Sequence, residues 1–177
     1  LYAFDQDEEA RQFSENVLKS VGSNFEIIPS NFVNLKEELQ KRKVTRVSGI
    51  MFDLGVSSPQ LDDAKRGFSF HEDARLDMRM DKSAKLSAYE VVNGYSEPDL
   101  ARVIKSYGEE KYAKNIARAI VKRRNVKAIN TTLELVSVIS EAVPAKYKRL
   151  THPARRTFQA LRIEVNGELS ILPKALN

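Results

Sequence analysis

Two aspartates follow short apolar runs, in positions where a carboxylate could bind a sugar. Asp5 follows the run Leu1–Phe4, and Asp53 follows Val47–Phe52. In open parallel sheets, ligands bind beyond the carboxyl ends of the strands, and an acidic residue after the second strand hydrogen-bonds the ribose of a bound nucleotide. The alternative is that Asp5 or the nearby Asp7 caps the following helix. Because two such aspartates occur, we favour ligand binding for Asp5 and Asp53.

A long polar segment with little periodicity follows Asp53. It reads GVSSPQLDDAKRGFSFHEDARLDMRMD, from Gly55 to Asp81. Loops of this length are uncommon in compact domains unless they carry function. The hydroxyls of Ser57 and Ser58 can accept hydrogen bonds from a substrate amine, which makes these two serines our candidates for a catalytic role. Serines that stabilise a turn explain them about equally well.

Basic residues concentrate in the second half of the chain. Between Arg102 and Arg162, 15 Lys and Arg stand against 4 Asp and Glu, a local charge of +11 in a chain whose net charge is +5. Such asymmetry is typical of a surface that binds a polyanion, although a solvated helical surface gives the same pattern.

Helical spacing places these residues on two polar faces. The first, which we call the basic stripe, comprises Lys111, Lys114, Arg118 and Lys122, and it is extended by Arg123 and Arg124. The second comprises Arg155, Gln159, Arg162 and Asn166. Arginine, lysine and amide side chains suit the phosphates and base edges of nucleic acid. The alternatives are ordinary surface ion pairs for the stripe and a structural polar network for Asn166.

Composition excludes several classes of site. The chain of 177 residues is 42% hydrophobic and 30% charged and contains no cysteine. Disulfides, zinc–thiolate sites and cysteine nucleophiles are therefore excluded, and a reducing cytoplasm is the expected location. His71 and His152 lie far apart in the sequence, so we expect no metal site. No apolar run approaches the roughly 20 residues of a membrane span, and we expect no membrane association.

Strand and helix signals alternate over the first third of the chain. Short apolar runs predict strands at Leu1–Phe4, Phe25–Ile28 and Val47–Phe52. Helical spacing predicts one helix that includes Ala10, Phe13, Val17 and Val21, and a short one around Leu35 and Leu39. Alternation of this kind predicts a doubly wound parallel sheet.

Only helices are predicted between Tyr89 and Pro144. Ser96 begins a helix that Gly108 ends, a second follows with Ile116 and Ile120 inside, and Thr131 with Glu134 caps a third. After them, one apolar face runs from Phe158 to Leu176, with a kink or an end expected at Pro173. The predicted fold is α/β, with a parallel sheet that is incomplete here and an inserted all-helical domain. We divide it into residues 1–84, a helical insertion at 85–150, and a return helix at 151–177.

Several stretches resemble one family of enzymes. They are FDLGVSSPQLDDAKRGFSFHEDARLDMRMD, YGEEKYAKNIARAI and HPARRTFQALRIEVNGEL, with AFDQD and SNF nearer the start. Together they resemble the bacterial ribosomal RNA small-subunit methyltransferases H, also called MraW, over most of Asp53–Leu169. The resemblance implies an S-adenosylmethionine-dependent enzyme that methylates N4 of a cytosine in the decoding region of 16S ribosomal RNA. It also implies a Rossmann-like methyltransferase domain with a helical insertion.

The same resemblance implies a cofactor site. Asp5 would hold the ribose, Phe32 of SNF would lie against the adenine, and Asp53 and Gln60 would complete the pocket near the methionine end. The family has a glycine-rich loop upstream and a further strand segment downstream, and the 7 glycines of this chain form no such cluster. We therefore expect a fragment that transfers little or no methyl by itself. The implied partner is 16S ribosomal RNA or the small ribosomal subunit, and a homodimer remains open.

Two other functions remain as alternatives. A non-catalytic RNA-binding module would explain the basic region and the lack of a glycine loop. A nicotinamide-dependent dehydrogenase would also place an acidic residue after its second strand, but it would not explain the +11 region. Methyl transfer itself needs no metal and no covalent intermediate, because a direct displacement depends mainly on alignment.

Overall fold

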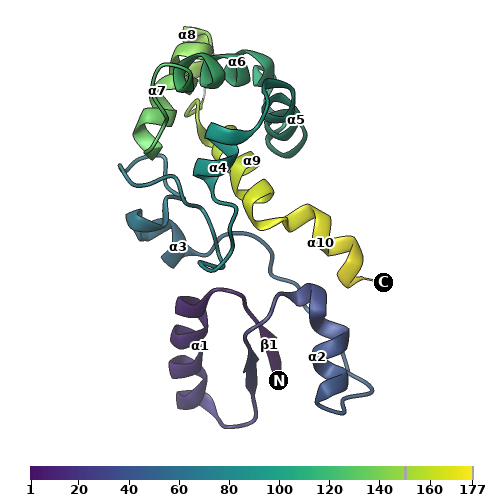
Figure 1. Cartoon of the computed structure of the whole chain (residues 1–177). Helices are drawn as coiled ribbons and strands as arrows, with labels where there is room; N and C mark the ends of the chain where they lie inside the picture. Colours follow the sequence, from purple (N-terminus) through teal and green to yellow (C-terminus); the bar gives the residue numbers. More distant parts are fainter. Residues whose placement is uncertain (150, 177) are drawn as a thin grey trace. The chain divides into compact units, whose positions relative to one another are not determined.

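The computed structural model describes residues 1–149 and 151–176, which group into two compact units (Figure 1). Unit 1 contains Leu1–Leu54, Met80–Ser83 and the residues from Gly167 onward. Unit 2 contains Gly55–Arg79 and Ala84–Asn166. Among the helices described, none is both long enough and apolar enough to cross a membrane.

Unit 1 is built on two parallel strands. β1 (Tyr2–Phe4) pairs with β2 (Glu26–Ile28), so that Phe4 lies opposite Ile28. The connection between them is α1 (Glu8–Val21), and Figure 1 shows α1 and α2 (Leu35–Lys41) flanking the two strands. The predicted α/β class and the first two predicted strands are confirmed.

The strand predicted at Val47–Phe52 is wrong. This segment forms no strand in the described structure, whose sheet contains β1 and β2. Ile50 and Met51 expose 55% and 89% of their surface. An apolar run shows where a strand could form, but a strand exists only where a neighbouring backbone accepts its hydrogen bonds.

The apolar stripe predicted for the first helix lies on a real helix but is not buried. α1 has no buried residue, and Phe13 and Val21 expose 66% and 81% of their surface. The spacing of these residues therefore identified the helix correctly, while in the part of the chain that the structure describes its apolar face stays exposed.

Unit 2 is helical. It contains α3 (Ser58–Asp62), η2 (Ala64–Arg66), α4 (Ala88–Gly94), α5 (Glu97–Gly108), α6 (Ala113–Arg124), α7 (Thr132–Ala142), α8 (Ala145–Lys148) and α9 (Arg155–Asn166). α5 packs against both α6 and α9, and α6 packs against α7. The caps follow the prediction, since Ser96 accepts a hydrogen bond from Asp99 N (3.2 Å) and Thr131 accepts one from Glu134 N (3.3 Å). The core of this unit includes Leu100, Ile104, Ile116, Ile120, Leu135, Ile139 and Leu161.

Gly108 allows α5 and α9 to approach closely. A β-carbon at this position would collide with the carbonyl oxygen of Arg156 and lie 3.2 Å from the β-carbon of Ala160. Arg156 also donates a hydrogen bond from its guanidinium to Glu109 O (2.6 Å), which fixes the start of α9 against the end of α5. Glycine is therefore required where these two helices pack.

The last helix breaks earlier than predicted. α9 ends at Asn166, Gly167 adopts a left-handed conformation with φ +62°, and α10 (Glu168–Ala175) continues with Pro173 inside it. The prediction that a helix would end at Pro173 is wrong, since α10 continues to Ala175. Gly167 ends α9 first, because glycine reaches the left-handed region at little cost. A kink at Pro173 stays a prediction. α9 lies in unit 2 and α10 lies in unit 1. The domain boundaries drawn at residues 84 and 150 stay a prediction.

Candidate functional site

The carboxyl ends of the two strands form one connected edge. Asp5 N donates to Ile28 O (3.3 Å), which extends the pairing of β1 and β2 by one residue. Beyond it, Asn31 Nδ2 donates to Gln6 Oε1 (2.7 Å) and so joins the loop after β2 to the loop after β1. The residues that follow the two strands are therefore held side by side, as expected at the ligand-binding edge of a parallel sheet.

The structure separates the roles of Asp5 and Asp7. Asp7 is the N-cap of α1, is 2% exposed, and accepts a hydrogen bond from Glu9 N (3.1 Å). Asp5 is not the cap, and its carboxylate accepts from Asp7 N (2.8 Å). Burial raises the pKa of the Asp5 carboxyl, and the hydrogen bond from Asp7 N only partly offsets this effect. Helix capping therefore explains Asp7 and leaves Asp5 for another role.

Phe32 and Asp53 lie in the same unit as Asp5. Phe32 begins the short helix η1 (Phe32–Asn34), whose N-cap is Asn31, so it is positioned by the same residue that bonds Gln6. The ring of Phe32 meets the ring of Phe52 edge to face, with centroids 5.6 Å apart. Asp53 follows Phe52 and is exposed. Three of the four predicted cofactor residues therefore belong to one connected part of unit 1.

Gln60, Ser57 and Ser58 belong to unit 2, at the start of α3. Ser57 is the N-cap, and its backbone N–H donates to Gln60 Oε1 (3.0 Å). Gln60 is 7% exposed, whereas both serines are exposed. The structure thus gives Ser57 and Gln60 a helix-capping role. For Ser57 this agrees with the alternative that the serines stabilise the local backbone.

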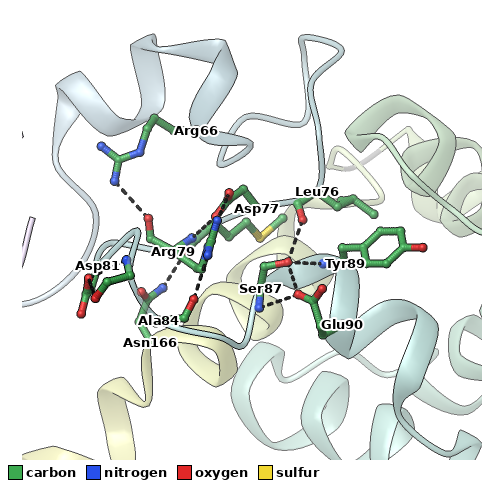
Figure 2. Close-up of polar contacts among 12 residues, drawn as sticks. Arg66, Leu76, Asp77, Arg79, Asp81, Ala84, Ser87, Tyr89, Glu90 and Asn166 are labelled. Atoms are coloured by element: carbon green, nitrogen blue, oxygen red, sulfur yellow. Dashed lines mark hydrogen bonds and ion pairs between the residues drawn. The ribbon is translucent and has the colours of Figure 1, made fainter.

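The long segment after α3 is ordered by a network around Arg79 (Figure 2). The Arg79 guanidinium donates to both carboxylate oxygens of Asp77 (2.7 Å each) and to Ala84 O (2.7 Å). Arg66, which is 5% exposed, donates to Arg79 O (3.0 Å). Burial opposes the charge on Asp77, but the hydrogen bonds from Arg79 outweigh it and lower the pKa of this carboxyl. The segment is therefore a fixed structure rather than a loose loop.

Asn166 closes this network from α9. Met78 is fully buried and has φ +61°, a conformation that is rare for a residue with a side chain. Its N–H donates to Arg66 O (3.0 Å), and its carbonyl oxygen accepts from Asn166 Nδ2 (2.8 Å). Asn166 also donates to Arg162 O (2.9 Å). The structural alternative for Asn166 is therefore the one that the contacts support.

The basic stripe lies on and just before α6. Lys114, Arg118 and Lys122 are exposed, and Arg118 lies 3.7 Å from Glu97. Lys111 precedes the helix, and its ammonium lies over the rings of Tyr112 and Tyr147, at 5.1 and 4.9 Å from their centroids. The stripe therefore presents its cations at the surface of unit 2.

Arg124 does not belong to this surface. Its guanidinium donates to Val92 O (2.7 Å) and to Tyr95 O, and its side chain is only partly exposed. It ties the end of α6 to α4, so the prediction that it extends the stripe is not supported by its contacts.

The second predicted polar face, on α9, is divided between surface and structure. Arg155 is exposed, and Arg162 is half-buried. Gln159 is exposed and donates a long hydrogen bond to Tyr107 O (3.5 Å). Of this face, Arg155 and Gln159 remain accessible, while Asn166 serves the network described above.

A cluster of aromatic rings brings together the two histidines, which the sequence separates. The rings of Phe70 and His152 stack with centroids 4.4 Å apart, and those of His71 and His152 lie 5.3 Å apart. His152 Nδ1 accepts from Ala154 N (3.3 Å) at the start of α9. Burial and the nearby His71 lower the pKa of His152, which favours the neutral ring that this bond needs. Among the described residues, no group of three or more potential ligands could hold a metal ion.

The chain was compared with known proteins. The MraW methylase family model matches residues 1–177. A ribosomal RNA small subunit methyltransferase H from Exiguobacterium sibiricum is 56% identical over 177 residues, covering 99% of this chain and 57% of the relative. Proteins with the same name from Oenococcus oeni and Ureaplasma parvum are each 54% identical, covering 99% and 100% of this chain and 57% and 58% of the relatives.

These similarities extend along the whole chain, including both the strand edge of unit 1 and the helices of unit 2. The chain spans a little over half the length of the curated relatives that it matches. The match of the family model over all 177 residues, together with identities above one half, shows that the chain belongs to the MraW methylase family.

Proposed function

We propose that the protein is an S-adenosylmethionine-dependent methyltransferase that acts on N4 of a cytosine in the decoding region of 16S ribosomal RNA. The observation that carries this proposal is the edge of β1 and β2, where Asp5 and the loop holding Phe32 are joined through the hydrogen bond from Asn31 to Gln6. The relatives are named as methyltransferases of small-subunit ribosomal RNA, which supports the choice of substrate.

The residues of unit 1 fit this cofactor. Asp5 is not needed as a helix cap, so its carboxylate can accept hydrogen bonds from ribose hydroxyls. The half-buried ring of Phe32 offers an apolar face to an adenine, and Asp53 of the same unit is proposed to lie near the methionine end. Gln60, the fourth residue predicted to bind the cofactor, lies in unit 2 and stays a prediction. When bound, S-adenosylmethionine supplies an electrophilic methyl group. The part of the protein that holds it is proposed to be a Rossmann-like domain, of which β1 and β2 are two strands, and residues 85–150 are proposed as its helical insertion.

The remaining requirement is orientation of the target amine. The lone pair of the cytosine amine is delocalised into the ring, so acceptors for its two hydrogens help the nitrogen to face the methyl donor. The exposed hydroxyls of Ser57 and Ser58 are the candidates for these acceptors. Because alignment accounts for most of the acceleration in such a displacement, no metal ion is assigned a role.

RNA binding is assigned to unit 2. The proposed contacts are Lys111, Lys114, Arg118 and Lys122 of the basic stripe, with Arg155, Gln159 and Arg162 of α9. These side chains would bind phosphates and sugars and so position the RNA, while the target base is flipped out of its stack towards the methyl donor. The proposed partner is the small ribosomal subunit in the cytoplasm, and a homodimer is a further hypothesis.

The experiment that tests this function uses the full-length protein with S-adenosylmethionine carrying a labelled methyl group. Small ribosomal subunits that lack the modification should gain label in 16S ribosomal RNA, and digestion to nucleosides should place it on N4 of cytidine. RNA binding without any transfer of label would favour the non-catalytic RNA-binding module. Tight binding of a nicotinamide cofactor instead of S-adenosylmethionine would favour the dehydrogenase.

Replacing Lys114 and Arg118 with alanine should weaken RNA binding and reduce its salt dependence. Each phosphate contact releases counterions when the RNA binds. The variant makes two contacts fewer, so the magnitude of the slope of log affinity against log salt should fall by about 1.5. Fluorescence anisotropy with a labelled 16S fragment at several salt concentrations measures both quantities. A Lys19→Ala, Lys41→Ala double variant, which removes two exposed lysines of unit 1, should leave the slope unchanged. An unaltered slope in the first variant would mean that the stripe is only a solvated surface.

A further inference from the structure

A groove of about 500 Å³ lies between α6 and α7 in unit 2. Its size is in the range of about 300–1,000 Å³ that is usual for small-molecule and nucleotide sites. Three cations line it, Arg118, Lys122 and Arg123, and all of them are exposed. Two of the three belong to the basic stripe, so the groove continues the surface already assigned to RNA.

Apolar side chains also line the groove. They are Ala119 of α6, Val126, and Val138 and Ala142 of α7. Ala119 and Ala142 are partly exposed, and Val138 is 5% exposed. A surface that only attracts phosphates needs no such apolar lining, because phosphate contacts are made by cations and hydrogen-bond donors. The flat apolar face of an unpaired base would be sheltered from water here.

Asn115 and Glu141 also line the groove. Asn115 offers an amide that can both donate and accept, and Glu141 offers a carboxylate. Carboxylates accept hydrogen bonds from the exocyclic amines of bases, and amides pair with base edges. The Glu141 carboxylate also argues against an acidic peptide as the occupant, since it would repel acidic side chains.

We propose that this groove binds one unpaired nucleotide of the RNA substrate. Its phosphates lie against Arg118, Lys122 and Arg123, its base rests on Ala119, Val138 and Ala142, and Asn115 and Glu141 contact the base edge. This proposal rests on the proposed function, because it takes RNA as the substrate. It adds that the helical unit recognises a single-stranded feature of that RNA and holds a base other than the one placed for methylation.

The test fills the groove in the full-length protein. In the Ala119→Phe variant the ring occupies part of the groove, and since Ala119 is partly exposed the helix can accept it. The matched control is Ala101→Phe, at a partly exposed alanine of α5 that does not line the groove. The probes are a labelled single-stranded RNA oligonucleotide, a set of the same oligonucleotide made abasic at each position in turn, and a duplex of equal length, all measured by anisotropy.

Ala119→Phe is expected to weaken single-stranded binding about tenfold, which is the scale of one well-held base, while Ala101→Phe binds as the wild type does. The wild type should lose similar affinity for at least one abasic oligonucleotide, and Ala119→Phe should lose nothing further from the same change. Duplex binding should be equal in all three proteins. Equal single-stranded binding by the two phenylalanine variants would overturn the proposal, as would RNA binding that is unaffected while an acidic amphipathic peptide binds the groove.

This outcome is separable from the proposed methyl transfer. The oligonucleotide measurements contain no S-adenosylmethionine, so they report the groove even if the protein transfers no methyl group. Conversely, a protein that methylates 16S ribosomal RNA while Ala119→Phe binds like its control would retain the proposed function and lose only the groove.

Discussion

Replacing Gly108 with alanine is expected to lower the free energy of unfolding of the helical unit by about 3 kcal/mol. The added methyl group would collide with the carbonyl oxygen of Arg156. Because this oxygen belongs to the backbone of α9, it can move away only if α9 separates from α5. These two helices form an extensive contact in unit 2, so their separation would loosen the core around Leu100 and Leu161. Urea denaturation followed by helical circular dichroism measures the loss.

Gly94 provides the matched control for this substitution. It lies at the end of α4, is exposed, and has no atom within 4 Å of the position that a β-carbon would occupy. Gly94→Ala should therefore be neutral or stabilising by up to about 1 kcal/mol, because alanine loses less conformational freedom in a helix than glycine does. Equal effects at the two positions would contradict the close helix contact at Gly108.

Replacing Asp5 with alanine or asparagine in the full-length protein should weaken S-adenosylmethionine binding about 10- to 100-fold. This is the range expected when hydrogen bonds between a carboxylate and the ribose hydroxyls are lost. Isothermal titration calorimetry with S-adenosylmethionine measures the change, and affinity for RNA should stay the same. Unchanged cofactor affinity in folded Asp5 variants would remove the central residue of the proposed site.

The effect of pH on this affinity has a defined sign. Burial raises the pKa of the Asp5 carboxyl above its ordinary value, and the protonated form loses an acceptor for the ribose. Cofactor affinity should therefore begin to fall at a higher pH than it would for a solvated aspartate, and this dependence should disappear in Asp5→Asn. Asp7→Ala should cost about 1 kcal/mol of stability through the lost helix cap. Because the Asp7 carboxylate also helps to raise the pKa of Asp5, this variant should shift the fall in cofactor affinity to lower pH.

Local signals in the sequence predicted the helical elements well. Ser96, Gly108 and Thr131 act on their immediate neighbours, so capping chemistry located the ends of α5 and the start of α7 correctly. The strand at Val47–Phe52 failed because pairing depends on a distant backbone, which an apolar run does not specify. The helix break failed in a similar way, since Gly167 and Pro173 both disfavour a helix and only the folded chain shows which of them ends it.

The candidate site shows the same division. The spacing of the basic stripe was visible in the sequence, and so was the place of Asp5 at the end of a strand, whereas Asp53 follows no strand in the described structure. What could not be read was which aspartate is used for capping, because Asp5 and Asp7 are chemically identical and differ only in their contacts. The role of Arg124 could not be predicted, since one of its partners is the backbone carbonyl group of Val92, which no sequence pattern identifies. For Asn166 a structural network was one of two predicted roles, and its bond to Met78 O favours that one. His71 and His152 lie in the stretches that resemble the family, but their spacing in the sequence does not predict that their rings lie side by side.

The bond between Asn166 and Met78 has a consequence for how the protein is made. The two residues are separated by 88 positions. At about 5–20 residues per second, a translating ribosome needs on the order of 4–18 s after adding Met78 before it adds Asn166. Throughout that interval the Arg66–Arg79 segment can form its own internal bonds, but it lacks the contact from α9 that holds the left-handed turn at Met78. The turn at Met78 therefore gains this hydrogen bond only after α9 has been synthesised.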